Sequence, residues 1–301
     1  MKGLKGISMI DFKQLIDAGL HFGHQKSRWC PKMEPYIWGH RGGIHLIDIS
    51  KTAHAMQKTA AFLEAVVARG ETVLWVGTKK PAKEAIVQVG LATNMPYVDY
   101  RWVGGTITNY AQVKKAVTKL LHYDDVVAKS KEENSVYTKK EVVRIQKLAE
   151  RLRRTFGGLK ALTMPIGAVV VVDVRKEQTA ILEALAAHIP VVALVDTNAD
   201  PSGISYVIPG NDDSAKGISF VLEFLKEGVL RGLSQRSEAA LKKARELEEQ
   251  KAGKLASHKS VDLSALESDE EEDSKSSSQR PVKAPFNNNN KRSSAPRKPR
   301  D

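Results

Sequence analysis

Cysteine is almost absent from this sequence of 301 residues, because Cys30 is the only one. A single thiol excludes an intramolecular disulfide, and a reducing cytosol is the natural setting for such a chain. Long apolar runs are missing too, since no stretch approaches the roughly 18 to 20 residues that span a bilayer. The N-terminus carries no basic-then-apolar signal, because Met9-Ile10 is followed at once by Asp11. We therefore expect a soluble cytoplasmic protein.

The sequence also lacks both glycine-rich motifs that cradle nucleotide phosphates, G-x-G-x-x-G and G-x-x-x-x-G-K-[ST]. Val76-Gly-Thr-Lys-Lys80 follows a predicted strand and begins a helix, so its backbone amides are a weaker candidate for a phosphate site. Asp48, Asp173 and Asp196 end predicted strands, where such a residue can bind a ribose or cap the next helix or turn. A Rossmann-like nucleotide-dependent enzyme is the alternative function, but the residue order supports no catalytic set.

Basic residues are in excess, with 47 Lys and Arg against 35 Asp and Glu, a net charge of +12 and a pI near 9.6. From Ser257 onward nine basic and eight acidic residues nearly cancel, so +11 lies on residues 1–256. A basic folded body favours polyanions, and nucleic acids above all. The tail contains the acidic block Glu267–Asp273, a serine cluster and four asparagines, a composition that buries no core and predicts disorder.

Continuous apolar segments separated by helical segments predict a parallel sheet covered on both faces, an α/β doubly wound fold. The predicted strands are Gly43–Ile49, Thr72–Gly77, Ala168–Asp173 and Pro190–Asp196. The predicted helices are residues 9–18 capped by Asp11, a helix capped by Ser50 that runs to about Arg69, Lys80–Leu91 and about Glu177–Ala187. We interpret residues 20–43 as irregular. Residues 1–233 form the α/β domain, and residues 234–301 form a charged helical extension followed by the tail.

One segment, residues 110–157, interrupts the alternation of strands and helices. Apolar residues recur there at intervals of three and four, which is helical spacing, with basic residues between them. They are Val113, Val117, Leu120 and Leu121, then Val142, Ile145, Leu148, Leu152 and Phe156. The polar stretch Ser130–Ser135 between the two groups resembles a turn. We predict an antiparallel helical hairpin that projects from the sheet, and two ordinary surface helices are the alternative.

Two segments combine arginine, tryptophan and glycine or proline: His24–Met33 and Tyr97–Asn109. Guanidinium groups and large flat rings suit an unpaired base or a sugar-phosphate ridge better than a small apolar substrate. The tryptophans can equally close the end of the sheet. The predicted RNA-binding residues are Arg28, Trp29, Lys32, Arg41, Lys79, Lys80, Arg101, Trp102, Asn109, Lys114, Lys115, Arg151, Arg153 and Arg154. We predict no cofactor and no catalytic residue.

Four histidines, His21, His24, His40 and His45, lie within 25 residues of one another, with Cys30 among them. Zinc uses such residue types, but the two-plus-two spacing of structural zinc sites is absent. Imidazole also suits contacts with phosphates and bases. Whether this region binds zinc stays open at the level of sequence.

Seven ordered motifs resemble those of the bacterial small-subunit ribosomal protein two family, over about residues 8–233. They are Ala18–His24, Arg28–Ile37, Arg41–Asp48 with Lys51-Thr52, Val76–Lys80, Arg101–Asn109, Asp196–Pro201 and Ile208–Asp213. The resemblance implies a flavodoxin-like fold with a projecting coiled-coil hairpin and no enzymatic activity. It also implies binding to small-subunit rRNA between head and body late in assembly, and docking of ribosomal protein one. Cys30 stands where that family usually has Asn, which argues against a ligand or redox role for the thiol.

Overall fold

The computed structural model describes residues 10–130 and 137–238, all within one unit, Met1–Leu241. The predicted disordered tail and most of the predicted turn Ser130–Ser135 lie outside the described residues. Within the described part of the chain, every helix is too short or too polar to cross a membrane.

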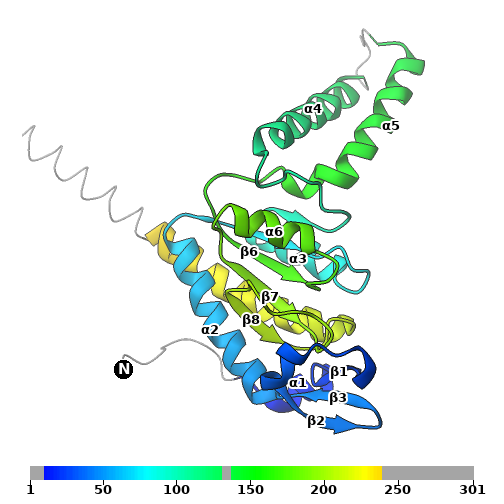
Figure 1. The fold of residues 1–301 in the computed structure, drawn as a ribbon. Helices are drawn as coiled ribbons and strands as arrows, with labels where there is room; N and C mark the ends of the chain where they lie inside the picture. The colour runs from blue at the N-terminus through cyan, green and yellow to red at the C-terminus, as the bar shows by residue number, and fades with distance from the viewer. Residues whose placement is uncertain (1–9, 131–136, 239–301) are drawn as a thin grey trace, which may run out of the picture. The chain divides into compact units, whose positions relative to one another are not determined.

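A parallel sheet of five strands forms the centre, in the order β5-β4-β6-β7-β8 (Figure 1). In chain order these strands are β4 (Thr72–Val76), β5 (Tyr97–Val98), β6 (Ile166–Val172), β7 (Val191–Val195) and β8 (Tyr206–Pro209). Counted along the chain this is the order 2-1-3-4-5, which is that of flavodoxin-like folds. The predicted α/β doubly wound class is therefore confirmed.

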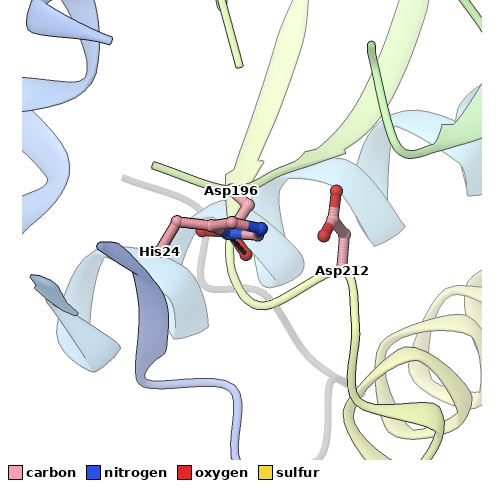
Figure 2. A group of neighbouring side chains, drawn as sticks. All are labelled: His24, Asp196 and Asp212. Carbon is pink, nitrogen blue, oxygen red and sulfur yellow. Dashed lines mark ion pairs between the residues drawn. The ribbon is translucent and has the colours of Figure 1, made fainter. Parts of the chain in front are cut away.

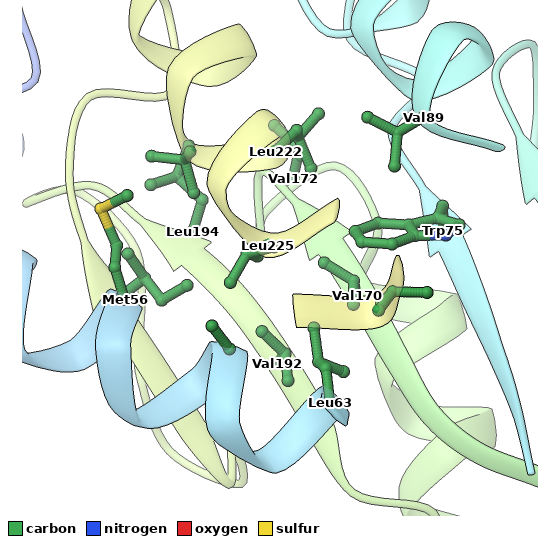
Figure 3. Close-up of a cluster of buried hydrophobic side chains, with 14 of the residues drawn as sticks. Met56, Leu63, Trp75, Val89, Val170, Val172, Val192, Leu194, Leu222 and Leu225 are labelled. Atoms are coloured by element: carbon green, nitrogen blue, oxygen red, sulfur yellow. The ribbon is translucent and has the colours of Figure 1, made fainter. Parts of the chain in front are cut away.

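The two faces of the sheet bury alternate residues of the same strands. Trp75, Val170 and Val192 face one cluster, which includes residues of α2 (Ile49–Ala68), α3 (Lys83–Thr93) and a helix over residues 215–238 (Figure 3). Leu74, Val169 and Val191 face the other cluster, which includes residues of α6 (Gln178–Ala186). Burial on both faces explains why these strands are continuously apolar in the sequence.

The first two helices each begin at an aspartate whose side chain serves as the cap. Asp11 accepts from the amide of Lys13 and caps α1 (Phe12–Asp17), as predicted. The predicted cap Ser50 is wrong by two residues: Asp48 is the cap of α2, and its carboxylate accepts from the amide of Ser50 at 3.0 Å. A carboxylate at this position satisfies a backbone amide that has no partner within the helix.

Residues 20–43 are not irregular, and that prediction is wrong. They contain β1 (Phe22–Gln25), the short 3-10 helices η1 (Lys26–Arg28) and η2 (Pro31–Tyr36), and β2 (Ile37–Arg41). With β3 (Ile44–Ile47) the two strands form a separate antiparallel sheet in the order β1-β3-β2. These strands were overlooked because they are short and expose much of both faces, so the sequence shows no clean alternation. The short edge strand β8 was missed as well.

The long segment after β5 forms two helices, α4 (Tyr110–Lys129) and α5 (Lys139–Phe156), which lie side by side (Figure 1). Thr138 and Glu141 form a capping box at the start of α5. How far the pair extends from the sheet remains a prediction. Leu120, Val126 and Ala149 are buried, whereas Leu121 and Leu148 are 50% and 41% exposed. The small Ala149 is thus buried where the sequence pattern had placed Leu148.

The first turn of α4 is part of the sheet's core. Val113 belongs to the cluster that includes Leu74 and Val169, and Val117 and Phe156 pack against that cluster. The hydroxyl of Tyr110 donates to the carbonyl of Leu162 at 2.8 Å. The helix pair is therefore fastened to the α/β core at this end.

Candidate nucleic-acid interface

One carboxylate on α6 organises the loop between β5 and α4. Oε1 of Glu183 accepts from Nε1 of Trp102 at 2.9 Å and from the amide of Gly105 at 2.8 Å. Oε2 accepts from the amide of Ile107 at 3.1 Å. Burial opposes ionisation of Glu183, but the hydrogen bonds from Trp102 and the loop amides outweigh it and lower its pKa. The loop is therefore held by a charged acceptor, which makes its hydrogen bonds strong.

The same bonds decide which side chains of the loop face solvent. Trp102 is 8% exposed and packs in the core. This agrees with the alternative prediction that the tryptophan closes the end of the sheet. Its neighbours Tyr100 and Arg101 are exposed. Gly105 has φ +88°, a conformation that favours glycine, whereas a Cβ on Gly104 would meet no atom within 4 Å. The loop thus presents an aromatic ring, a guanidinium and open backbone at one place.

Some charged side chains of α4 and α5 form ion pairs within the protein, whereas others line a cavity. The carboxylate of Asp124 forms ion pairs with the guanidinium of Arg153 at 2.5 Å and with Nζ of Lys160 at 2.9 Å. Burial opposes ionisation of Asp124, but the hydrogen bonds from Lys160 and Arg153 outweigh it and lower its pKa. Arg153 is therefore engaged in holding α5 against α4. Its neighbours Arg151 and Arg154 instead line an open cavity.

This cavity, called here the cation cleft, has a volume of about 920 Å³ and lies between the loop and the paired helices. Five cationic side chains line it against one acidic side chain, Glu150; the cations are Arg101, Lys119, Lys147, Arg151 and Arg154. Its aromatic lining comes from Tyr100, Trp102, Tyr123 and Phe156. Its volume lies within the range of about 300 to 1,000 Å³ that is usual for ligand pockets. An anionic ligand with flat rings fits this combination.

Cations and rings in and beside the cleft are in contact with one another. The guanidinium of Arg154 lies 5.6 Å from the ring centre of Tyr100, and Nζ of Lys83 lies 5.1 Å from it. Nζ of Lys119 lies 5.6 Å from the ring centre of Tyr123. Such cation–π contacts are worth about 0.5 to 1 kcal/mol at exposed sites. They therefore help to hold the cationic side chains beside the rings.

Comparison with known protein families matches residues 15–232 to the family described as ribosomal protein S2. The chain belongs to the ribosomal protein S2 family. It is thus a structural protein of the small ribosomal subunit and takes part in translation. The match covers the α/β core, both sheets and the paired helices, and it confirms the resemblance carried by the seven motifs.

In this S2-family chain the first Arg-Trp segment lies apart from the cation cleft. Arg28 and Arg41 are exposed at the ends of η1 and β2, and neither lines the cleft. Trp29 is half-buried. Lys32 is already paired, since its Nζ lies 2.7 Å from a carboxylate oxygen of Asp200. The two Arg-Trp segments therefore present two separate basic regions.

Of the two predicted lysines after β4, only Lys80 is exposed. Lys79 points into an acidic cluster at the carboxyl edge of the sheet, where its Nζ lies 2.6 Å from Asp213, 2.8 Å from Asp212 and 3.3 Å from Asp173. Burial opposes its charge, but the hydrogen bonds to Asp212 and Asp213 outweigh it and raise its pKa. The charge of Lys79 is therefore balanced internally. The remaining predicted residues, Asn109, Lys114 and Lys115, are exposed at the start of α4.

The same cluster contains the residues that could hold a metal ion. His24, Asp196 and Asp212 offer ligand atoms within 4.8 Å of one another (Figure 2). Nδ1 of His24 lies 3.0 Å from Asp196, and its Nε2 lies 3.4 Å from Asp213. One imidazole and two carboxylates form a donor set that suits a divalent cation. The ammonium of Lys79 already pairs with Asp212, so a metal ion would compete with it.

Two further groups of this cluster, besides Lys79, have shifted pKa values. Burial raises the pKa of Asp212 to about 6, against the opposing hydrogen bond from Lys79. The hydrogen bond that His24 donates to the carboxylate of Asp196 raises the pKa of His24, although burial opposes it. Both groups therefore hold protons at a higher pH than in an unfolded chain.

The four histidines considered for zinc are not gathered at one point. His40 and His45 have ring centres 6.4 Å apart, and the ring of Trp29 lies 5.2 Å from that of His45. His21 instead lies against the neighbouring Phe22, with the ring centres 3.9 Å apart and the rings tilted by 40°. Among the described residues, His24 is the one histidine that joins a metal-capable group, and its partners are aspartates.

The crevice where doubly wound sheets bind nucleotides lies beyond β4 and β6, where the strand order reverses. Here the amide of Thr78 donates to Glu177 at 3.0 Å, and the Thr78 hydroxyl donates to the same carboxylate. Glu177 is 2% exposed, and burial raises its pKa. Nζ of Lys176 donates to the carbonyl of Thr78 at 3.0 Å. The carboxyl group of Glu177 therefore accepts from the backbone amide of Thr78, which the sequence had made a candidate for binding a phosphate.

Several residues of the interface were missed by sequence reasoning. Lys119 lies four residues after Lys115 and four before Tyr123, and Lys147 lies four before Arg151. This spacing places them on common helix faces and was the available signal. Glu183 had no such signal, because it lies far along the chain from the loop that it holds.

Proposed function

We propose that this S2-family protein binds small-subunit rRNA, with the cation cleft as its principal contact. The observation that carries the proposal is the convergence of five cations, against one acid, on a cavity with aromatic walls. Phosphate groups neutralised by these side chains would release counterions, which supplies much of the affinity of protein–RNA complexes. As the family resemblance implies, we place the protein in the cytoplasm, ribosome-bound between the head and body of the subunit.

The sheet serves as the scaffold of this proposal. It holds the cation cleft and the exposed cations of the first Arg-Trp segment, Arg28 and Arg41, on one folded unit. Exposed Lys80, Lys114 and Lys115 add further positive charge. A protein with separate basic regions can join separate rRNA segments. The function is structural, and the nucleotide-dependent enzyme gains no support, because Glu177 occupies the amide of Thr78.

Docking of ribosomal protein one and contacts with neighbouring proteins of the small subunit belong to the same proposal. They rest on the family resemblance. Purified ribosomal protein one should bind small subunits that contain this chain and should bind subunits reconstituted without it less tightly. Equal binding to both would remove this chain from the docking site.

Sucrose-gradient sedimentation of a lysate tests the proposed function. The chain should sediment with small subunits at low salt and should leave them as salt is raised. A slowly sedimenting pool that binds a nucleotide would favour the enzyme instead. Replacing Arg101 and Arg151 together by Gln should release the chain at lower salt than the unchanged protein requires.

A further inference from the structure

We propose that the cation cleft receives an unpaired nucleotide of its RNA, with the base held against the aromatic wall and the phosphates on the cations. The proposal rests on the function proposed above and specifies which form of RNA the cleft recognises. It assigns distinct tasks to Tyr100, Tyr123 and the cations around them.

The lining of the cleft is too apolar for a site that contacts phosphates alone. Tyr123 and Phe156 bring rings into it, and Leu148, which is 41% exposed, brings an aliphatic surface. In a duplex the faces of the bases are stacked on one another, so such a lining would meet only the backbone. An unpaired base has free faces that stack on aromatic side chains. The lining therefore favours a single strand.

The guanidinium of Arg154 lies over the ring of Tyr100 at one wall of the cleft. The guanidinium lies 5.6 Å from the ring centre, and both side chains are exposed. Bases stack on guanidinium planes as well as on aromatic rings, so either member can meet a base. Arg101 and Arg151 lie at the same cavity and are left for phosphate oxygens.

The backbone of the loop leaves room for a ligand at this wall. A Cβ on Gly104 would meet no atom within 4 Å, so a ligand can come close to the main chain there. Glu183 holds the adjoining Trp102 and Gly105, which keeps the wall in place before RNA binds. A wall fixed in advance lowers the ordering cost of binding.

An acidic peptide is the main competitor for such a cleft, and the chain carries an acidic block of its own, Glu267–Asp273. A peptide of Asp and Glu would use the five cations but would leave the aromatic lining without a partner. The mixture of rings and cations therefore favours a nucleotide. The experiment below includes the peptide as one of its outcomes.

Binding of labelled oligonucleotides to the full-length protein tests the proposal. A ten-nucleotide single strand should bind more tightly than a ten-base-pair duplex of the same sequence at equal salt. Tyr100→Leu and Tyr123→Leu each keep apolar volume but remove a stacking ring. Each should weaken single-strand binding by about 5-fold or more, as expected from base–aromatic stacking, and should leave duplex binding unchanged. Tyr137→Leu, at an exposed tyrosine outside the cleft, is the matched control and should change neither.

Binding to whole small-subunit rRNA, measured in parallel, separates this proposal from the proposed function. If whole rRNA binds but the tyrosine variants bind single strands as the unchanged protein does, the nucleotide assignment is wrong and the function stands. If whole rRNA does not bind, the function itself fails. A peptide with the sequence of residues 265–275 that binds more tightly than the single strand, and is unaffected by Tyr123→Leu, would assign the cleft to an acidic segment.

Discussion

The indole Nε1 of Trp102 lies 2.9 Å from Oε1 of Glu183, and this hydrogen bond joins the loop after β5 to helix α6. It turns the one tryptophan of the loop toward the core, so that Trp102 is only 8% exposed, and it leaves Tyr100 and Arg101 exposed at the cleft. The proposed RNA-binding surface therefore depends on a residue that need not touch RNA at all. Glu183 is a positioning residue in this account.

Glu183→Gln should loosen the loop, because the amide end of glutamine offers one acceptor where the carboxylate offers two. Leaving the buried N–H of Trp102 or an amide of the loop without a partner costs about 1 to 3 kcal/mol. We expect the free energy of unfolding in urea to fall by that amount. Single-strand RNA binding should weaken as well.

The pH dependence of this difference is a further check on Glu183. Its pKa is lowered in the folded protein, so its ionised form contributes stability above the ordinary pKa of 4.5. That contribution is lost as the pH falls through the lowered pKa. The difference in unfolding free energy between the unchanged protein and Glu183→Gln should therefore shrink in acid. A difference that is constant down to pH 2 would contradict an ionised anchor.

Arg151→Gln and Arg153→Gln form a matched pair two residues apart on α5. Arg151 lines the cleft, whereas Arg153 pairs with Asp124. Arg151→Gln should reduce the slope of log affinity against log salt by about 0.7 to 0.9, which corresponds to one phosphate contact, with little change in stability. Arg153→Gln should lower the melting temperature and leave the slope unchanged. The reverse assignment of effects would show that the cleft is not the binding surface.

Gly104 and Gly105 should respond differently to alanine. At Gly105 φ is +88°, and a Cβ would lie 3.1 Å from Cβ of Asn109, so Gly105→Ala should destabilise the fold. The left-handed conformation alone costs about 1 to 2 kcal/mol for a residue with a side chain. Gly104→Ala meets no neighbour and should be nearly neutral in urea unfolding. Equal losses at both positions would contradict the loop conformation.

Ionisation of Asp212 lowers the free energy of unfolding as the pH rises. Its pKa is raised from 3.8 to about 6, so protonation favours the folded state, and this stability is lost as the pH rises through about 6. Between pH 5 and pH 7.5 the loss attributable to Asp212 is about 1 kcal/mol. The pKa of His24 is also raised, and it acts in the same direction. Asp212→Asn should therefore show a smaller decline in unfolding free energy over this range, and an unchanged decline would exclude Asp212 as its cause.

The central strands could be predicted from the sequence because burial on both faces leaves a continuous apolar run, as in Val169–Val172. The strand β8 could not, since four residues are too few to show a pattern. The small antiparallel sheet was missed for a related reason. Gly39 and the exposed His40 sit within β2, so its pairing with β3 shows only in three dimensions.

At the site, sequence reasoning located the Arg-Trp-Gly-Gly loop but could not orient it. Tyr100 and Trp102 are both aromatic, and it is the carboxylate of Glu183 that draws one of them inward. Likewise, Arg151 and Arg153 look alike in the sequence, and only the ion pair of Arg153 with Asp124 distinguishes their roles. Such distinctions come from partners that are distant along the chain, which a local pattern does not contain.

Protection of lysines in assembled small subunits tests the central claim most directly. Acetylation rates at Lys119 and Lys147, both on the cleft, can be compared between the free protein and the protein in subunits. Exposed Lys58, which lies outside the cleft, gives a reference rate. The account predicts that Lys119 and Lys147 are protected at least several-fold more than Lys58. Equal rates at Lys119 and Lys147 in the free and assembled protein would contradict rRNA binding through the cation cleft.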